Sequence, residues 1–207
     1  MSAVAERRPA RGKKADEEML RQLADPWWRL THLYWIVDEN AKAIPFRPNE
    51  EQTTLFKNLG RMNLILKARQ LGCTTFLALM ALDQCLFVPN FTAAIIFHNL
   101  LDAEKAFRGK IKFAYDRLPD EVKAQIPVKK ETGTEMVFEN GSSIGVGVSA
   151  RSGTVQWLHV SEFGKICAHF PEKAREVVTG SFNAMPADSM TFIESTAEGQ
   201  EDRKSVV

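Results

Sequence analysis

The most constraining feature of this sequence is an alternation, from Phe46 onward, between short apolar runs and longer stretches with helical periodicity. Apolar runs of strand length separated by helices predict βαβ units, in which a mostly parallel sheet is covered by helices on both faces. Residues 135–148 depart from this pattern, because two apolar runs flank Asn140-Gly141 and predict a hairpin. The strands are predicted at 62–66, 93–97, 155–160 and 190–193, and the helices at 74–87, 101–118 and 171–184.

Length and composition exclude several classes of protein. The chain has 207 residues, enough for one domain with a real core. A formal net charge of +1 excludes a bulk polycation, so any contact with nucleic acid must come from a local patch. Three cysteines without a C-x-x-C pair exclude a disulfide framework and a cysteine-ligated zinc site. No apolar run approaches the roughly 18 residues of a membrane span, and no secretory signal is visible.

The N-terminal segment, residues 1–24, is basic. Residues 1–14 carry five basic side chains and one acid, so we expect disorder there, followed by a short helix over 16–23. The segment serves either as a solubilising tail or as an arm that binds DNA or a partner. An aromatic cluster follows, which we expect to pack this segment onto the domain, with a base-stacking platform as the alternative. Its members are Trp27, Trp28, Tyr34 and Trp35.

A candidate phosphate-binding loop follows the first predicted strand and opens the next helix. Such loops require this context, because backbone N–H groups and the helix N-terminus together attract an anion. Aligned with G-x-x-x-x-G-K-[ST], Gly72 is the second glycine and Thr74 is the hydroxyl that reaches Mg²⁺. Cys73 stands where the phosphate lysine belongs, so Lys67 and Arg69 are the cations available for the phosphates. The alternative is an ordinary strand-to-helix turn with incidental basic residues. The loop reads Lys67-Ala68-Arg69-Gln70-Leu71-Gly72-Cys73-Thr74-Thr75.

The segment KARQLGCTT resembles the deviant Walker A loop of the large terminase subunit, the ATPase that packages DNA into the capsids of tailed bacteriophages. In that family the loop lysine is often displaced to the front of the loop, where Lys67 stands here. The resemblance extends from about Phe46 to Gly199. It implies a P-loop NTPase fold of the additional-strand class, an ATPase domain over residues 25–200, and ATP and Mg²⁺ as ligands, with Thr74 binding the metal.

Two further motifs of this resemblance end predicted strands. HVSEFGKI resembles a Walker B strand, in which Glu162 polarises the attacking water and Ser161 replaces the usual metal-binding aspartate. A neutral hydroxyl is a weak substitute, and Glu162 taken alone is a solvated acid at a strand end. The segment STAEG is similar to the terminase coupling motif, which senses the γ-phosphate. Both motifs are expected at the sheet edge where ligands bind. The implied coupling residues are Ser195, Thr196, Ala197 and Gly199.

The resemblance also implies an arginine finger and an adenine contact. Arg151 precedes the Glu162 strand and is the candidate finger in trans, with Arg69 as a candidate in cis; the alternative for Arg151 is a surface arginine. Gln52 can donate to and accept from the adenine edge, or is an exposed helical glutamine. We interpret the helix over 101–118 as a solvated face, and the four scattered histidines as structural. They are His32, His98, His159 and His169.

The resemblance therefore implies the ATP-hydrolysing motor domain of a terminase, which drives double-stranded DNA into the procapsid in the host bacterial cytoplasm. The implied partners are the portal protein, the small terminase subunit and further copies of this chain in a ring. We expect the nuclease domain of the family to be absent, and therefore no DNA cleavage. The chain is then either an isolated ATPase domain or a truncated prophage product. We expect residues 201–207 to form a tail. The alternatives are a degenerate module without ATPase activity and another P-loop motor such as a helicase.

Overall fold

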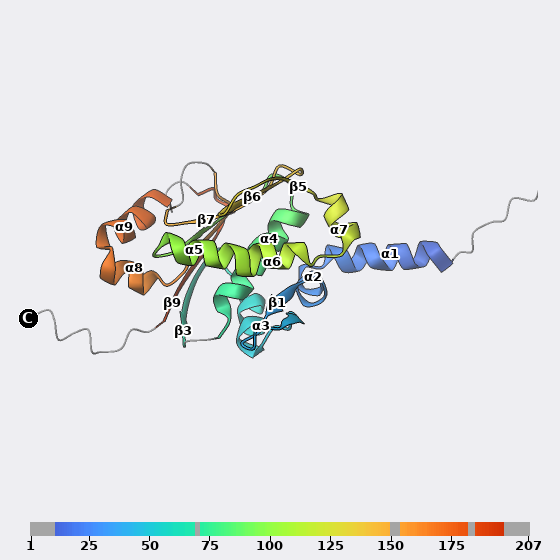
Figure 1. Ribbon diagram of the computed structural model, residues 1–207, viewed down its shortest axis with the longest axis horizontal. Helices are drawn as coiled ribbons and strands as arrows, with labels where there is room; N and C mark the ends of the chain where they lie inside the picture. Colours follow the sequence, from blue (N-terminus) through green and yellow to red (C-terminus); the bar gives the residue numbers. More distant parts are fainter. Residues whose placement is uncertain (1–10, 69–70, 150–153, 182–184, 197–207) are drawn as a thin grey trace, which may run out of the picture.

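A seven-stranded sheet forms the centre of the protein, in a computed structural model that describes residues 11–68, 71–149, 154–181 and 185–196 (Figure 1). The strand order is β3-β9-β8-β4-β7-β6-β5. Neighbours from β3 to β7 in this order pair in parallel, whereas β6 and β5 are antiparallel, which confirms the predicted α/β fold. The strands are β3 (Met62–Lys67), β4 (Thr92–Ile96), β5 (Val128–Glu131), β6 (Glu135–Phe138), β7 (Ser143–Gly147), β8 (Trp157–Val160) and β9 (Met190–Thr196).

β9, the last of the described strands, lies between β3 and β8. Its register pairs Glu194 with Ile65 of β3, and Ile193 with Val160 of β8. This order agrees with the additional strand that the resemblance implied. It also brings the ends of the three strands that carry the predicted motifs to one edge of the sheet.

Helices cover both faces of the sheet, because alternate side chains of the strands point to opposite faces. On one face, α4 (Cys73–Phe87) is buried on nearly every side and shares a core cluster with Trp157 and Phe192. On the other face, α8 (Phe163–His169), α9 (Pro171–Glu176) and the π-helical segment η2 (Val177–Ser181) pack on Leu158 and Val160. The predicted helix after residue 171 is thus present, while α8 was not predicted.

A long helical run crosses the α4 face of the molecule. It consists of α5 (Leu100–Ala106), the π-helical segment η1 (Phe107–Lys112) and α6 (Phe113–Asp116), and α7 (Asp120–Gln125) begins just after Pro119. This confirms the predicted helix over 101–118. The predicted hairpin is also present as β6 and β7, with Gly141 of its turn at a φ of 83°. None of the described helices has the length and apolarity needed to cross a membrane.

The N-terminal part of the chain packs against the body through α2 (Pro26–His32). It also includes α1 (Arg11–Ala24), the two-stranded ribbon β1 (Trp35–Val37) and β2 (Ala43–Pro45), and α3 (Glu50–Lys57). The helix α1 extends away from the body (Figure 1) and starts at Arg11, within the stretch where we expected disorder. Of the aromatic cluster, Tyr34 is buried and both Trp27 and Trp28 pack on the core, whereas Trp35 is 37% exposed.

A buried ion pair joins α2 to α4. The guanidinium of Arg29 donates to both carboxylate oxygens of Asp83, with Nη2 2.6 Å from Oδ2, and the Tyr34 hydroxyl donates to Oδ1 at 2.9 Å. Arg29 Nη1 also donates to the backbone oxygen of Leu23, at 2.7 Å. These contacts satisfy polar groups that would be costly to bury alone.

Candidate functional site

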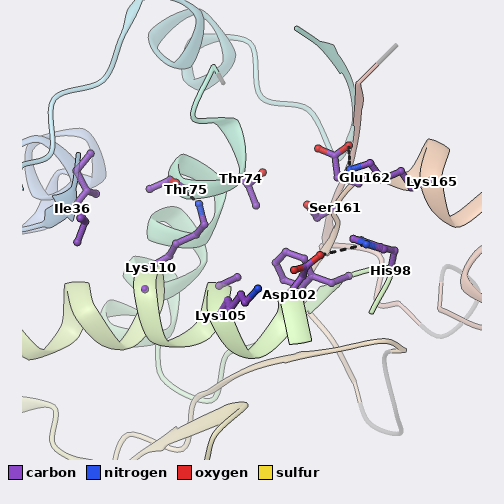
Figure 2. A pocket seen from close by; sticks show the side chains of 14 residues that line it. Ile36, Thr74, Thr75, His98, Asp102, Lys105, Lys110, Ser161, Glu162 and Lys165 are labelled. Carbon is purple, nitrogen blue, oxygen red and sulfur yellow. Dashed lines mark hydrogen bonds and ion pairs between the residues drawn. The ribbon is translucent and has the colours of Figure 1, made fainter. Parts of the chain in front are cut away.

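The carboxyl ends of β3, β8 and β9 meet where the predicted phosphate loop turns back into α4. Gly72 precedes α4 with a φ of 67°, a left-handed conformation that glycine adopts without strain. A Cβ atom on Gly72 would lie 2.8 Å from the side-chain nitrogen Nε2 of Gln52, so the turn also favours a residue without a side chain. The turn places Thr74 and Thr75 in the first turn of α4, near the strand ends (Figure 2).

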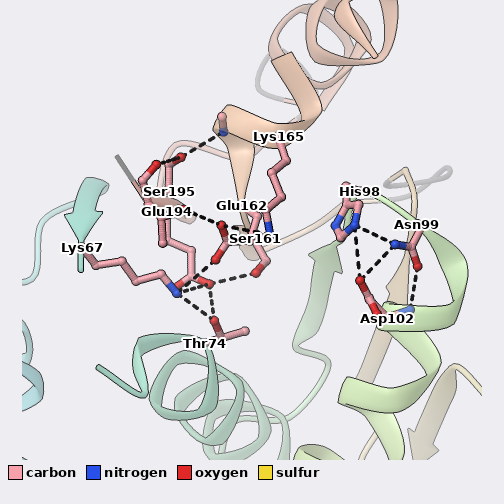
Figure 3. Close-up of polar contacts among 12 residues, drawn as sticks. Lys67, Thr74, His98, Asn99, Asp102, Ser161, Glu162, Lys165, Glu194 and Ser195 are labelled. Atoms are coloured by element: carbon pink, nitrogen blue, oxygen red, sulfur yellow. Dashed lines mark hydrogen bonds and ion pairs between the residues drawn. The ribbon is translucent and has the colours of Figure 1, made fainter. Parts of the chain in front are cut away.

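Lys67, the last residue of β3, directs its ammonium group at oxygens from three other elements (Figure 3). Its Nζ atom lies 3.1 Å from Thr74 Oγ1, 3.3 Å from Glu194 Oε1 and 3.5 Å from Glu162 Oε1. The Lys67 side chain is only 9% exposed, so solvent screens these contacts weakly. The predicted phosphate cation is therefore at the strand ends, where two carboxylates engage its charge.

Glu194 on β9 is fully buried at the centre of this cluster. Its Oε1 atom accepts hydrogen bonds from the hydroxyls of Thr74 and Ser161, the latter at 2.8 Å. The Nε2 atom of His159 lies 3.4 Å from the same oxygen. Burial raises the pKa of Glu194, but the neighbouring imidazole, the Lys67 ammonium and the Thr74 hydroxyl lower it by more, to about 2. Glu194 is consequently ionised at neutral pH.

Glu162 lies at the junction between β8 and α8 in an unusual backbone conformation. Its φ and ψ are 55° and 48°, in the left-handed region that costs a non-glycine residue of the order of 1 kcal/mol or more. The surrounding contacts hold it there: Oε2 accepts a hydrogen bond from Thr196 Oγ1 at 3.1 Å, and Oε1 faces Lys67. The side chain is 20% exposed and lines the adjoining cavity (Figure 2), so it can reach a ligand.

The predicted coupling motif is connected to both Glu162 and α8. Ser195 Oγ accepts a hydrogen bond from the backbone N–H of Gly164 at 3.1 Å and donates to the backbone oxygen of Thr196 at 3.0 Å. A Cβ atom on Gly164 would lie 2.6 Å from Ser195 Oγ, so a side chain at this position would displace the Ser195 hydroxyl. A displacement at the end of β9 would therefore move both Glu162 and α8.

A cavity of about 400 Å³ opens beside the strand ends (Figure 2). Its wall joins the start of α4, the end of β8 and the α5–η1 run, with the ribbon strand β1 on one side. On the α5 side, the Nε2 atom of His98 lies 3.3 Å from the Oδ2 atom of Asp102. The polar lining residues are Thr74, Thr75, His98, Asp102, Lys105, Lys110, Ser161, Glu162 and Lys165.

Lys110 on η1 reaches into this cavity from the helix that we interpreted as a solvated face, and for this residue that interpretation is wrong. Its Nζ atom donates to Thr75 Oγ1 at 2.6 Å. Burial lowers the pKa of Lys110, and its ammonium forms no salt bridge within the described parts of the chain. A cation in a cavity without a carboxylate partner is suited to receive an anionic ligand.

Gln52 is buried beneath the loop and is not the exposed glutamine that we considered as its alternative role. Its Nε2 atom donates to the backbone oxygen of Leu71 at 3.2 Å, and its Oε1 atom accepts from the N–H of Asn49, which caps α3. These contacts support the loop from below. The adenine contact of Gln52 stays a prediction.

The remaining predicted residues divide into two groups. Ala68 is the last described residue before position 69, and Cys73 is the first residue of α4, where it is buried, with a pKa raised by burial. Five predicted site residues lie outside the described residues. They are Arg69, Gln70, Arg151, Ala197 and Gly199.

Solved structures of similar fold include the large terminase ATPase domain of Thermus phage P74-26. This chain shares that domain's fold with a TM-score of 0.54 and 16% sequence identity, over 74% of this chain and 66% of that one. The chain has the fold of a phage large terminase ATPase domain. A single-substitution variant of the same domain gives a TM-score of 0.54 and 16% identity, with 75% and 68% coverage. The chain thus spans about two thirds of the length of these domains, while no family model and no curated protein matches its sequence.

Sequence reasoning missed three members of the site, and for each a signal was present. Glu194 lies two residues after Phe192 on an apolar strand, so both side chains point to the same buried face. A buried acid needs a polar partner. Lys110 follows Ala103 and Ala106 at helical spacing, on the stripe that faces the core. His159, which we interpreted as structural, precedes Glu162 by three residues and contacts Glu194 across the strands.

Proposed function

We propose that this chain is the ATP-hydrolysing motor domain of a phage terminase large subunit. One observation supports this most: the phosphate-loop turn, the acid Glu162 and the Ser195-Thr196 hydroxyls, which lie far apart in the sequence, meet at one edge of the sheet, beside a cavity that Thr74 and Glu162 line. The shared fold with terminase ATPase domains agrees with this arrangement. A helicase is the less favoured enzyme, because the loop and strand-end motifs resemble those of terminases and the fold is that of a terminase ATPase domain.

The residues of the site divide the work of hydrolysis between them. The loop amides and Lys67 hold the phosphates, with Arg69 as a further cation from the sequence pattern. Glu162 accepts a proton from the attacking water and orients it, while Thr196 Oγ1 holds the carboxylate of Glu162 in place. Arg151 or Arg69 neutralises charge in the transition state. Gln52 supports the loop and contacts the adenine.

Magnesium fits the donor set at the strand ends. Mg²⁺ prefers oxygen ligands, and the hydroxyls of Thr74 and Ser161 both lie within hydrogen-bond distance of one ionised carboxylate. The ammonium of Lys67 already lies among these oxygens, so the cluster attracts a cation. When bound, the metal would supply positive charge to the β- and γ-phosphate oxygens.

The motor function extends beyond hydrolysis. We infer that turnover is coupled to translocation of double-stranded DNA into the procapsid, at the portal, in the host bacterial cytoplasm. Partners would be the portal protein, the small terminase subunit and further copies of this chain in a ring. The hydrogen bonds of Ser195 and Thr196 to α8 and Glu162 support a coupling role for this motif.

A degenerate module that assembles but does not hydrolyse ATP is the second candidate. The ion pairs of Lys67 with Glu162 and Glu194 favour it, since both the loop cation and the general base are engaged by each other. The absence of a charge at Cys73 acts in the same direction. The two candidates differ in whether phosphate is released.

The test combines ATP binding with phosphate release over a range of protein concentrations, because a ring motor can need a neighbour's arginine. Glu162→Gln should bind ATP within about twofold of the unaltered chain and release phosphate at least about 100-fold more slowly. Glu172→Gln removes an exposed acid paired with Arg175 and serves as the control. Near-normal hydrolysis by Glu162→Gln would refute the assignment, and failure of the unaltered chain to bind ATP saturably would refute the motor function.

A further inference from the structure

Just past the end of β8, the residue before Glu162 is not an acid, because Ser161 is neutral. A hydroxyl alone contributes no charge to a divalent cation, and hard cations such as Mg²⁺ are held in proteins largely by carboxylates. If the proposed function is correct, a negative charge for the metal must come from elsewhere in the fold. The neighbouring strand β9 provides the candidate.

Glu194 lies beside Ser161 on the adjacent strand. The parallel register pairs Ile193 with Val160, so the next residue of each strand, Glu194 and Ser161, lies side by side at the carboxyl ends. Neighbouring strands are about 4.8 Å apart, and a glutamate side chain can cross that gap. It does so here, since Ser161 Oγ donates to Glu194 Oε1 at 2.8 Å (Figure 3).

The same carboxylate oxygen also contacts the loop side of the site. Thr74 Oγ1, the hydroxyl predicted to bind the metal, donates to Glu194 Oε1. Glu194 thus joins the hydroxyl at the start of α4 to the hydroxyl at the end of β8. Glu194 therefore contacts both hydroxyls from the strand next to β8.

Two observations indicate that this carboxylate serves a ligand as well as Lys67. Its second oxygen, Oε2, is buried and has no hydrogen-bond partner among the described residues. An orphaned carboxylate oxygen is costly to bury unless a ligand satisfies it. In addition, the ammonium of Lys67 is shared between Glu194 and Glu162, so it is not committed to Glu194 alone, and Lys165 Nζ also lies 3.9 Å from Glu162 Oε2.

We propose that Glu194 supplies the carboxylate that holds the catalytic magnesium, together with the hydroxyls of Thr74 and Ser161, in place of the acid that Ser161 replaces. The proposal rests on the proposed ATPase function and assigns a metal ligand within it. Lys67 then serves the phosphates, and Glu162 keeps its role as the general base. A purely structural Glu194, which only anchors Lys67, is the outcome that the experiments must exclude.

The first experiment measures metal binding directly, with Mn²⁺ as the probe. Mn²⁺ is titrated into the full chain with a non-hydrolysable ATP analogue, and bound metal is counted by electron paramagnetic resonance. Glu194→Gln should lower Mn²⁺ affinity at least about tenfold while analogue binding in EDTA changes little. Glu172→Gln, which removes an exposed carboxylate that does not line the cavity, is the control and should change Mn²⁺ affinity less than about twofold.

A second variant separates a metal ligand from a structural partner. Returning the acid to the neighbouring strand, in Ser161→Asp with Glu194→Gln, should restore Mn²⁺ affinity to within about threefold of the unaltered chain. If Glu194 only anchored Lys67, the affinity would be unchanged in the single variant. Unchanged Mn²⁺ affinity in Glu194→Gln overturns the proposal and leaves the ATPase function standing, whereas failure of the unaltered chain to bind the analogue refutes that function itself.

A third measurement needs no variant, so a fold lost on substitution cannot obscure the result. Fe²⁺ replaces Mg²⁺ with the bound analogue, and ascorbate and hydrogen peroxide generate hydroxyl radicals that cut the backbone beside the metal. Mass spectrometry should find cuts near Glu194 as well as near Thr74 and Ser161. Cuts near Thr74 and Ser161 without any near Glu194 would overturn the proposal.

Discussion

At the scale of single residues, the buried carboxylates Glu194 and Asp83 differ in how their oxygens are hydrogen-bonded. One oxygen of Glu194 has no hydrogen-bond partner among the described residues, whereas both oxygens of Asp83 accept hydrogen bonds from Arg29 and Tyr34. Burial raises the pKa of Asp83 above its usual range, although Arg29 and Tyr34 lower it. The pair thus offsets only part of the free energy that its own burial costs.

The first prediction concerns this Arg29–Asp83 pair. Asp83→Leu should lower the free energy of unfolding by about 3–5 kcal/mol, because it leaves the Arg29 guanidinium buried without its counter-charge. The double variant, with Arg29→Met added, should recover most of that loss, since neither charge then needs solvation. Urea denaturation followed by circular dichroism measures both values.

The exposed Arg21–Glu18 pair provides the control, with side chains 77% and 48% exposed. Arg21→Ala should change the free energy of unfolding by less than about 1 kcal/mol. A double variant as unstable as Asp83→Leu would contradict the account, because the loss would then come from packing and not from an unpaired charge.

At the scale of elements, the helical run from α5 to α6 shows how a functional residue is hidden in a regular pattern. Ala103, Phe107 and Ile111 are buried and follow helical spacing, and the sequence predicted this helix correctly. Lys110 lies on the same stripe, but its charge suggested the solvent side. The π-helical segment η1, a feature often found at functional sites, brings its ammonium to Thr75.

The second prediction follows from this position of Lys110. Lys110→Ala should weaken ATP binding about tenfold, because it removes a cation that lines the cavity without a carboxylate partner in the described parts of the chain. Lys112→Ala is the matched control, since this lysine of the same segment pairs with Asp116 and Glu131 on the surface. Isothermal titration in the presence and absence of Mg²⁺ measures both affinities. Equal affinity of the two variants would show that the Lys110 ammonium has only a structural role with Thr75.

Much of the sheet could be predicted from the sequence, because β3, β4, β6, β7, β8 and β9 are local apolar runs. The edge strand β5 was not predicted, because three of its four residues are charged. The position of β9 in the sheet could not be predicted, because no local pattern indicates that this strand inserts between β3 and β8. The loop, Glu162 and the Ser195-Thr196 pair were predicted by their motifs. Glu194 was not, because its role depends on the contact with Ser161 across two strands.

At the scale of the whole molecule, the two faces of the sheet are covered unequally. The core cluster under α4 reaches Ile65 of β3, whereas the cluster under α8 and α9 involves β4 and β8. On that second face, Met62, Leu64 and Leu66 are 61%, 74% and 77% exposed. β3 is also the last strand of the described sheet on its side, paired with β9 alone. An apolar face beside an unpaired backbone edge is a template for association.

The third prediction is that the isolated chain associates with itself through this edge as its concentration rises. Leu64→Lys should lower the association, because a charge on an edge strand opposes both burial of the apolar face and pairing of the backbone. The loss should appear in light scattering as a smaller rise of the average mass with concentration. Leu101→Lys is the control: this leucine is 58% exposed, but it lies on α5, where the helix satisfies its own backbone. Equal effects of the two substitutions would indicate nonspecific hydrophobic association. An unaltered chain that stays monomeric at every concentration would contradict association through β3.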